Sequence, residues 1–467
     1  MTLLTRPIHC LRSSSPFITF VIAFAVFTDQ FLFAAIIPVI PFSLESRLKI
    51  PETSTQFWVA VLFGVFGLAA FASSPLWGWW SDRHTSRRMP FLIGLLILFG
   101  ATMILWFGES IGLQVLGRTL QGIASTVVWT TGLAGLVDTV GQEHIGEYMG
   151  WIGIALNSGS ILAPLLGGIV FAKAGYDAVF GLVTGVVVLD MLLRLVMVES
   201  PAVLAEFEHE LATANLRRNS APVDGRSLQS DDEEGKKAPI VSVTLATTYT
   251  ALPSFIRLAC SYRVIVTLWA TIVLASIFSG FQAVLPLKVH DTFGWDATGG
   301  GLIFLPLSAP ALLGPVIGRF TDRYGGRWFA FAGFLILCVA LALLRLIENN
   351  TAEQKALLCV LLVLVGSCMT LTLEPVLAEI TSAAARLERS DGEAGLEVKS
   401  SYCQAYALFN MAWAAGNFAG PLWGGLLAEA AGWKFMTMSM SIVAGLSAIP
   451  IGLFLGGWLS GQGKPGP

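Results

Sequence analysis

The feature that most constrains this chain is a series of apolar runs, each about as long as a helix that crosses a lipid bilayer. At ~1.5 Å of rise per residue, roughly twenty apolar residues span the ~30 Å hydrocarbon layer. Only 13% of the 467 residues are charged, whereas about a quarter of a soluble domain is charged. These observations predict an all-α, polytopic integral membrane protein.

The apolar runs form two groups of six, separated by a long polar segment. The predicted spans are residues 17–43, 57–80, 89–108, 112–137, 147–171, 177–198, 264–288, 298–319, 328–347, 356–381, 401–428 and 433–457. The predicted domains are a tail (1–16), an N-terminal six-helix bundle (17–198), a linker (199–263), a C-terminal six-helix bundle (264–457) and a second tail (458–467). Because the linker is polar and carries an acidic cluster at 231–234, we expect it to be partly disordered.

Arginines indicate which ends of the spans face the cytoplasm. The loops 81–88 and 320–327 are arginine-rich, and positive residues favour the cytoplasmic side. Both tails and the linker are then cytoplasmic. The sequon that starts at Asn349 falls in an outside loop and is a candidate glycosylation site.

Two motifs occur twice, in the same order. Residues 75–83 resemble 315–323 at an offset of 240, and residues 159–168 resemble 416–425 at an offset of 257. Matching motifs in both halves predict an internally duplicated transporter with pseudo-two-fold symmetry. The difference of 17 places an insertion between the tenth and eleventh spans, in a charged loop at 386–399.

These motifs resemble those of the major facilitator superfamily, whose loop signature is Gly-x-x-x-Asp-Arg/Lys-x-Gly-Arg/Lys-Arg/Lys. The second copy matches it at Gly318, Asp322 and Arg323, followed by Gly325 and Arg327. The first copy keeps Gly78, Asp82 and Arg83, but Thr85 replaces the turn glycine. The resemblance implies twelve helices in two bundles and alternating access.

Residues 118–122 resemble the Arg-x-x-Gln-Gly motif of the same superfamily. Two other runs resemble its drug:proton antiporter branch. Residues 150–168 resemble the antiporter motif of that branch, with alanine where glycine is usual before the proline. Residues 27–41 look like the first helix of vesicular amine transporters and their fungal relatives. The resemblance implies proton-coupled export by a monomer.

Asp29 is the first candidate proton-coupling residue. It lies about twelve residues into its span, so it is roughly 18 Å deep. A carboxylate at that depth costs about 2.5–3.5 kcal/mol on insertion scales, and burial in low dielectric disfavours its charged form. Asp29 could therefore carry a proton or bind a cationic substrate. The structural alternative is a protonated, hydrogen-bonded acid or an ion pair.

Arg118 and Glu374 complete the proton-coupling prediction. Arg118 keeps its charge and needs a carboxylate, carbonyls or water, and the resemblance assigns it to proton coupling, with Asp29 as a possible partner through water. Glu374 precedes Pro375, which loosens the helix locally. The alternative for Arg118 is a structural hydrogen-bond hub. Asp190 and Arg194 have i,i+4 spacing, which favours a structural ion pair.

The predicted substrate-binding residues are polar or aromatic side chains within spans. They are Gln121, Trp129, Phe33, Gln282 and Asn410. Gln121 lies one turn from Arg118 on the same helix face. Amine transporters carry an acid where this chain has Asn410, which counts against monoamines as cargo. An aromatic residue in a membrane helix is more often part of the core or lipid-facing than in a pocket.

Residues of both repeats are predicted to act in gating and contact between the bundles. The glycines let helix backbones approach closely, and the prolines bend the helices. This set comprises Gly78, Asp82, Arg83, Gly318, Asp322, Arg323, Gly159, Pro164, Gly167, Gly168, Gly420 and Pro421. The alternatives are ordinary small-residue packing and a polar turn that sets topology.

Together the sequence predicts a transporter, not an enzyme, that exports lipophilic or cationic organic compounds in exchange for protons. No Gly-x-x-x-x-Gly-Lys-Ser/Thr motif occurs, so the energy source would be a proton gradient and no cofactor, metal or nucleic acid is expected. The alternatives are proton-symport or facilitated uptake of a small organic nutrient and, more remotely, a non-transporting membrane receptor or membrane enzyme. We expect the plasma membrane rather than the vacuolar membrane, by family habit.

Overall fold

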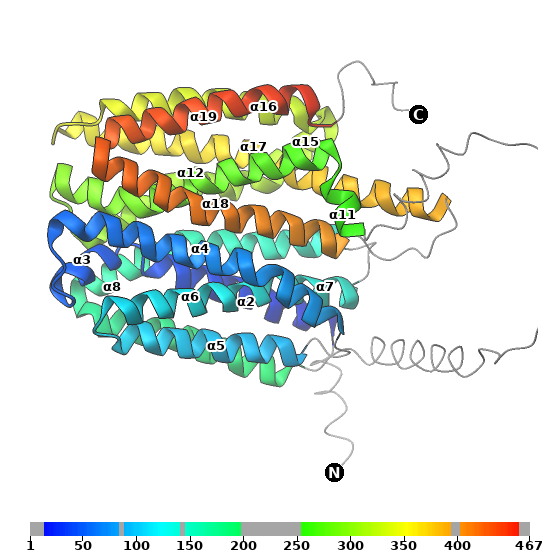
Figure 1. Ribbon diagram of the computed structural model, residues 1–467, viewed down its shortest axis with the longest axis horizontal. Helices are drawn as coiled ribbons and strands as arrows, with labels where there is room; N and C mark the ends of the chain where they lie inside the picture. The colour runs from blue at the N-terminus through cyan, green and yellow to red at the C-terminus, as the bar shows by residue number, and fades with distance from the viewer. Residues whose placement is uncertain (1–13, 84–87, 141–144, 198–253, 394–401, 457–467) are drawn as a thin grey trace, which may run out of the picture.

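The chain folds into a bundle of long helices that lie side by side along one axis (Figure 1). The computed structural model describes residues 14–83, 88–140, 145–197, 254–393 and 402–456. Within those residues there is no strand, and eight helices are long and apolar enough to cross a membrane. The predicted all-α membrane class is confirmed, whereas the count of twelve crossings stays a prediction. The acidic cluster of the linker lies outside the described residues.

The first half of the chain forms one group of helices, and the second half forms another. The elements of the first half are α2 (Ser15–Ala35), α3 (Ile40–Ser46), α4 (Glu52–Arg83), α5 (Arg88–Phe107), α6 (Ile111–Val127), the π-helical turn η1 (Val128–Gly132), α7 (Leu133–Val140) and α8 (Ile145–Val196). The elements of the second half are α11 (Ser254–Ala259), α12 (Tyr262–Phe293), α13 (Ala297–Leu302), α14 (Phe304–Ser308), the 3₁₀ turn η2 (Ala309–Leu313), α15 (Gly314–Tyr324), α16 (Gly326–Leu343), η3 (Leu344–Leu346), α17 (Ala352–Glu393), α18 (Tyr402–Ala431) and α19 (Trp433–Phe454).

Two helix pairs make the most extensive contacts between the halves. In Figure 1, α18 of the second half runs beside α4 of the first half. The other main pair is α13 of the second half with α8 of the first. Within the first half α2 packs on α8 and α4 on α6, while α12 packs on α18 within the second. We call the end where α8 ends and α12 begins the linker end, and the opposite end the distal end.

Proline content explains where the helices break. The span predicted at 298–319 is divided into α13, α14, η2 and α15. It contains Pro306, Pro310 and Pro315, and each proline removes a backbone donor and crowds the preceding turn. The span predicted at 401–428 contains the single Pro421 and stays one helix. The first predicted span, 17–43, is likewise interrupted at 36–39, a turn that contains Pro38.

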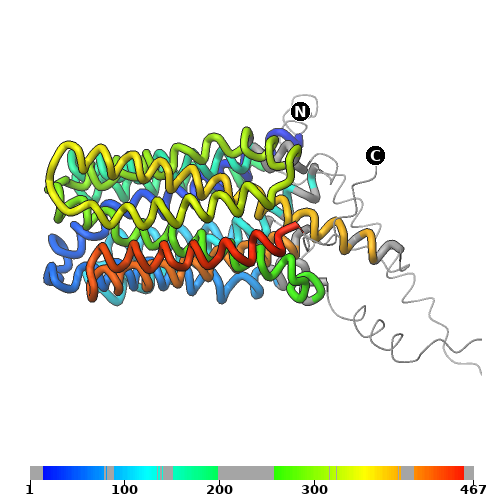
Figure 2. Tube along the Cα trace, turned by 90° about the horizontal axis from the view of Figure 1, so that it is seen from above, coloured from blue at the N-terminus to red at the C-terminus, as the bar shows by residue number. Residues whose placement is uncertain are grey.

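Two predicted connections differ in outcome. The fifth and sixth spans are two helices under the one label α8, and they meet at Gly175, where the backbone is not helical, with a φ of 78°, a conformation that glycine adopts without strain. The loop predicted at 386–399 is wrong in its first part, because α17 continues to Glu393. This helix has 42 residues, or ~63 Å at ~1.5 Å per residue, and it projects past the linker end (Figure 2).

Candidate functional site

Asp29 of α2 forms a buried polar contact with the helix opposite. Only 5% of the residue is exposed. Ser125 Oγ donates a hydrogen bond to Asp29 Oδ2 over 2.8 Å, and Trp129 Nε1 donates to the same oxygen over 3.2 Å. Within the described part of the chain, no hydrogen bond to Oδ1 and no salt bridge to Asp29 is found. One carboxylate oxygen is held by neutral donors, and the other is left for a proton or a ligand.

The backbone of the fourth predicted span positions those donors. Ser125 lies near the end of α6, and Trp129 lies in the π-helical turn η1 that follows it. A π-turn inserts one residue into the helix and so changes the direction of the side chains after it; such turns are frequent at functional sites. Trp129 thereby contacts the same carboxylate oxygen as Ser125.

Arg118 lies on α6, nearer the distal end of the bundle than Ser125. The residue is almost fully buried, with 1% exposed. Arg118 Nη1 donates to Gln121 Oε1 over 2.9 Å. The guanidinium carbon lies 4.9 Å from the ring centroid of Phe63 and 5.6 Å from that of Phe33, distances that allow cation–π attraction. Arg118 Nε and Nη2 find no hydrogen-bond partner among the described residues.

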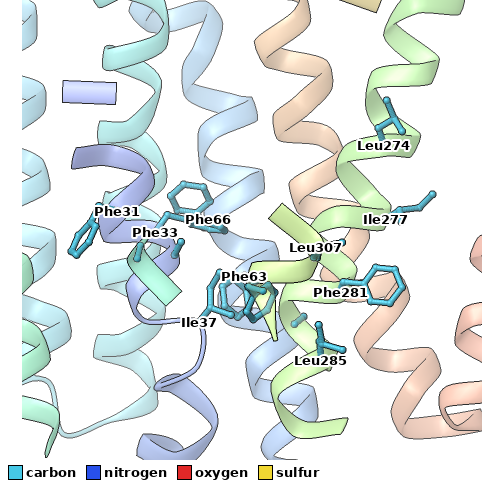
Figure 3. Close-up of a cluster of buried hydrophobic side chains, with 14 of the residues drawn as sticks. Phe31, Phe33, Ile37, Phe63, Phe66, Leu274, Ile277, Phe281, Leu285 and Leu307 are labelled. Carbon is cyan, nitrogen blue, oxygen red and sulfur yellow. The ribbon is translucent and has the colours of Figure 1, made fainter. Parts of the chain in front are cut away.

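The two polar groups share one helix face but do not touch. Arg118 and Ser125 are seven residues apart on α6, which is ~10 Å along the axis. Arg118 therefore does not pair directly with Asp29, and the water-mediated contact stays a prediction. Around them lies an apolar layer of buried residues from both halves. Phe33 packs on Phe63 and Phe66 within the first half, whereas the ring of Phe281 points away from them and packs against Trp433 of its own half (Figure 3).

The remaining predicted site residues lie elsewhere. Glu374 of α17 lies in the second half, with Oε1 only 2.6 Å from the position that a methyl group on Gly314 would occupy. Asn410 Nδ2 donates to Ser74 Oγ over 3.3 Å, across the α4–α18 contact. Gln282 of α12 is buried. The structure therefore does not bring these three residues into the Asp29 cluster.

Glycine pairs explain how closely the halves approach. A methyl group on Gly167 would collide with the backbone of Ala35 in the same half, whereas one on Gly168 would collide with Ala297 of the other half. In the second repeat, Gly424 lies against Gly280 of its own half and Gly425 against Ala60 of the other. One glycine of each pair thus packs within its half and the next packs between the halves.

The other predicted gating residues divide between these two roles. The Pro164 carbonyl meets Gly301 of the opposite half, so Pro164 lies at the boundary. Gly159 packs on Gln30, and Gly420 packs on Ser276 and Ser279. For Gly159, Gly167 and Gly420 the structure thus shows packing within a half instead of between halves. Pro421 lies inside α18.

Part of the repeated loop motif lies outside the described side chains. This applies to Gly78, Asp82, Arg83 and Asp322. Gly318 lies on α15 close to Glu374, and Arg323 is exposed near the end of that helix. Asn349 is exposed in the turn between η3 and α17, at the distal end. Its glycosylation stays a prediction.

Asp190 and Arg194, predicted to form an ion pair, attract each other electrostatically but are not joined by a hydrogen bond. Both residues are buried, yet neither oxygen of Asp190 has a hydrogen-bond partner in the described part of the chain. Arg194 instead places its guanidinium carbon 3.3 Å from the ring centroid of Phe91, and its Nη1 lies 3.7 Å from Met197 Sδ. The ring of Phe91 on the neighbouring helix α5 is thus in closer contact with the guanidinium than the expected carboxylate is.

Sequence analysis did not find Ser125 and Phe63. A signal for Ser125 was present, because it lies seven residues from Arg118 and four from Gln121, on the same helix face. Phe63 comes from α4 and meets Arg118 only through helix packing, so no local pattern indicates it.

A bundle of membrane-length helices in two packed halves, with charged groups buried between its helices, is the architecture of a secondary membrane transporter. The sequence model of the Major Facilitator Superfamily matches residues 20–388 and 303–462 of this chain. The chain belongs to this superfamily. It is therefore a multi-pass membrane protein that acts in membrane transport.

Individual relatives agree with this assignment. An uncharacterized MFS-type transporter of Schizosaccharomyces pombe is 32% identical and covers 90% of this chain and 91% of its own length. A probable vesicular acetylcholine transporter of Danio rerio is 32% identical over 38% of this chain and 37% of its own length. A crystal structure of a POT family transporter in complex with 5-aminolevulinic acid matches with a TM-score of 0.67 and 15% identity, over 94% of this chain and 96% of that one. That similarity concerns the fold alone.

Proposed function

We propose that this protein is a proton-coupled antiporter that exports lipophilic or cationic organic compounds. The observation that carries the proposal is the half-satisfied carboxylate of Asp29, with two neutral donors on Oδ2 and none on Oδ1 among the described residues. An acid buried without a permanent cation can hold a proton in one state and a cationic substrate in another. If Asp29 binds either a proton or a substrate but never both at once, the movement of protons is coupled to the movement of substrate.

Two further features support the substrate class. The buried phenylalanines Phe33, Phe63 and Phe66 of the first half form an aromatic cluster beside Arg118, which a lipophilic compound could contact if the halves moved apart (Figure 3). A relative that covers 38% of the chain is named for acetylcholine, which is an organic cation. Arg118, buried and only partly hydrogen-bonded, supplies a fixed positive charge that favours departure of a proton or cation from this half.

The test uses purified protein in proteoliposomes with an imposed proton gradient and rhodamine 6G, a lipophilic cation, as the probe. The wild type should move the probe against the proton flow. Asp29→Asn, which cannot ionise, should lower gradient-driven transport at least tenfold. Asp177→Asn is the matched control, because Asp177 is an exposed carboxylate on α8.

Two results would contradict the proposal. If the Asp29→Asn variant transported the probe at the wild-type rate in the proton gradient, Asp29 would have no role in proton coupling. Probe movement in the same direction as the protons would indicate symport instead of antiport.

A further inference from the structure

Asp190 is a second buried acid of the first half, and it has no role in the proposed function. It lies in the second helix of α8, after Gly175. The residue is 0% exposed, and neither of its carboxylate oxygens has a hydrogen-bond partner among the described residues. An ionised carboxylate is costly at such a place, because neither water nor a donor stabilises its charge. The state of Asp190 therefore depends on the charges near it.

Two charged residues act on Asp190. Arg194, one turn further along the same helix, attracts it, and Asp29 of α2 lies close enough to repel it. Other charges are scarce here, because Asp29 is the only charged residue of α2 and α5 has none after Arg88. When all three groups are ionised, two negative charges face one positive charge. The cluster then lacks one positive charge.

Packing around Phe91 shows the order of the three groups along the helix axes. The guanidinium carbon of Arg194 lies 3.3 Å from the Phe91 ring centroid. A methyl group on the last residue of η1 would lie 3.0 Å from the same ring and 3.9 Å from Ile22 of α2, so Arg194 and Ile22 are near one level. Asp190 lies ~6 Å beyond Arg194 and Asp29 ~10 Å beyond Ile22, both toward the distal end, because the two helices run in opposite directions (Figure 1). Asp190 therefore lies between Asp29 and Arg194.

A proton is the ligand that fits this cluster. Within the part of the chain that the structure describes, no three acidic, histidine or cysteine side chains are grouped as a metal ion would need. One proton on either acid would balance the three charges. Two neighbouring carboxylates commonly hold one proton between them, because the charge of one disfavours the charge of the other.

We propose that Asp29 and Asp190 form one proton-binding site that holds a single proton. While Asp29 carries the proton, Asp190 is ionised and faces Arg194. When the proton leaves Asp29, it binds to Asp190, because the new charge on Asp29 repels a second one. A cationic substrate at Asp29 removes that repulsion, and the pair then releases its proton. The use of the pair in transport rests on the proposed antiport, whereas the shared proton itself does not.

Infrared spectroscopy of the purified full-length protein at neutral pH tests the shared proton directly. The C=O stretch of protonated carboxylic acids, compared in H2O and D2O, measures how many acids carry a proton. Asp29→Asn and Asp190→Asn should each remove the same part of this signal, because either change leaves one acid balanced by Arg194. The double variant should lose no more than each single variant. Other buried acids contribute equally to all the variants, so the differences report on this pair.

Transport of rhodamine 6G in proteoliposomes tests the use of the pair. Asp190→Asn should lower gradient-driven transport roughly tenfold or more, because the remaining acid no longer needs a proton. Exchange of labelled for unlabelled probe without a gradient should stay near the wild-type rate, whereas a structural defect would lower both. Asp177→Asn is the matched control, an exposed carboxylate in the same helix of α8, and should change neither rate.

Each infrared result decides the proposal. Equal loss in both single variants, with no further loss in the double variant, supports one shared proton. An unchanged signal in Asp190→Asn would mean that Asp29 titrates alone, and additive losses would mean two independent protons; either would overturn the proposal. If the wild type failed to exchange protons for the probe while the infrared losses were shared, the antiport would be wrong and the proton pair would stand.

Discussion

Asp29 differs from a structural buried acid in how its hydrogen bonds are distributed. A structural carboxylate in a membrane helix is stabilised when both oxygens are bonded or a cation is adjacent. Here Ser125 and Trp129 both bond Oδ2. This one-sided arrangement orients the carboxylate without neutralising it, which suits a group that exchanges ligands.

Ser125→Ala should lower gradient-driven transport roughly tenfold, because a hydrogen bond to a charged group contributes about 1.5–3 kcal/mol. The remaining hydrogen bond, from Trp129, is longer at 3.2 Å and would orient the carboxylate less well. Thr119→Val is the control, since the Thr119 hydroxyl bonds only its own helix, at Val115 O. Initial transport rates in proteoliposomes measure the effect. Equal rates for both variants would mean that Ser125 does not position Asp29.

Asp190→Asn should cost far less stability than the rupture of a buried ion pair, which is about 3–5 kcal/mol. The reason is that Asp190 makes no hydrogen bond or salt bridge to Arg194 within the described residues. Thermal unfolding of the purified variant in detergent measures the cost. A large fall in the unfolding temperature would show that the i,i+4 pair forms after all.

At the scale of elements, the apolar runs predicted the long helices well. The reason is that the side of a helix that faces lipid and the side that faces the bundle both require apolar residues. The breaks were harder to predict. Proline clustering accounts for the division of α13 to α15. The π-turn at 128–132 carries no proline or glycine before its last residue, so only tertiary contacts reveal it. The continuation of α17 to Glu393 likewise has no apolar run to indicate it, because residues 386–393 are mostly polar or charged.

Gly168→Ala should reduce transport at least tenfold while the protein still folds, because the added methyl group would collide with the backbone of Ala297 across the boundary. A state with α8 and α13 in contact would then be disfavoured, and transport requires both states. Gly153→Ala is the matched control, because Gly153 lies before Gly175 on the same helix as Gly168 and a methyl group there meets nothing within 4 Å. Transport rates and size-exclusion profiles separate function from folding. Wild-type transport by Gly168→Ala would contradict a role for this contact in the cycle.

At the scale of the whole molecule, the sequence repeats predicted the contacts between the halves better than local patterns predicted the candidate site. The paired glycines place equivalent contacts at α8–α13 and α4–α18, and this relation was visible in the sequence as two Gly-Gly runs at an offset of 257. The site is less symmetric. Arg118 and Gln121 could be paired from their spacing on one helix, but Phe63 and Ser74 could not, because contacts between helices depend on packing that no local pattern encodes.

The α4–α18 contact offers a direct test of movement between the halves. Ser74 and Asn410 meet across it at 3.3 Å. We expect a short bifunctional thiol reagent to cross-link the pair Ser74→Cys and Asn410→Cys and to lower transport at least tenfold, because alternating access requires the halves to separate there. A reductant that cleaves the reagent should restore the rate. The matched control joins two helices of one half: Ser441→Cys lies beside the native Cys338, whose Sγ is 3.4 Å from Ser441 Oγ. Cross-linking this pair should leave most of the transport intact. If joining the two halves had no greater effect than joining α16 to α19, the α4–α18 contact would be a fixed hinge instead of a gate.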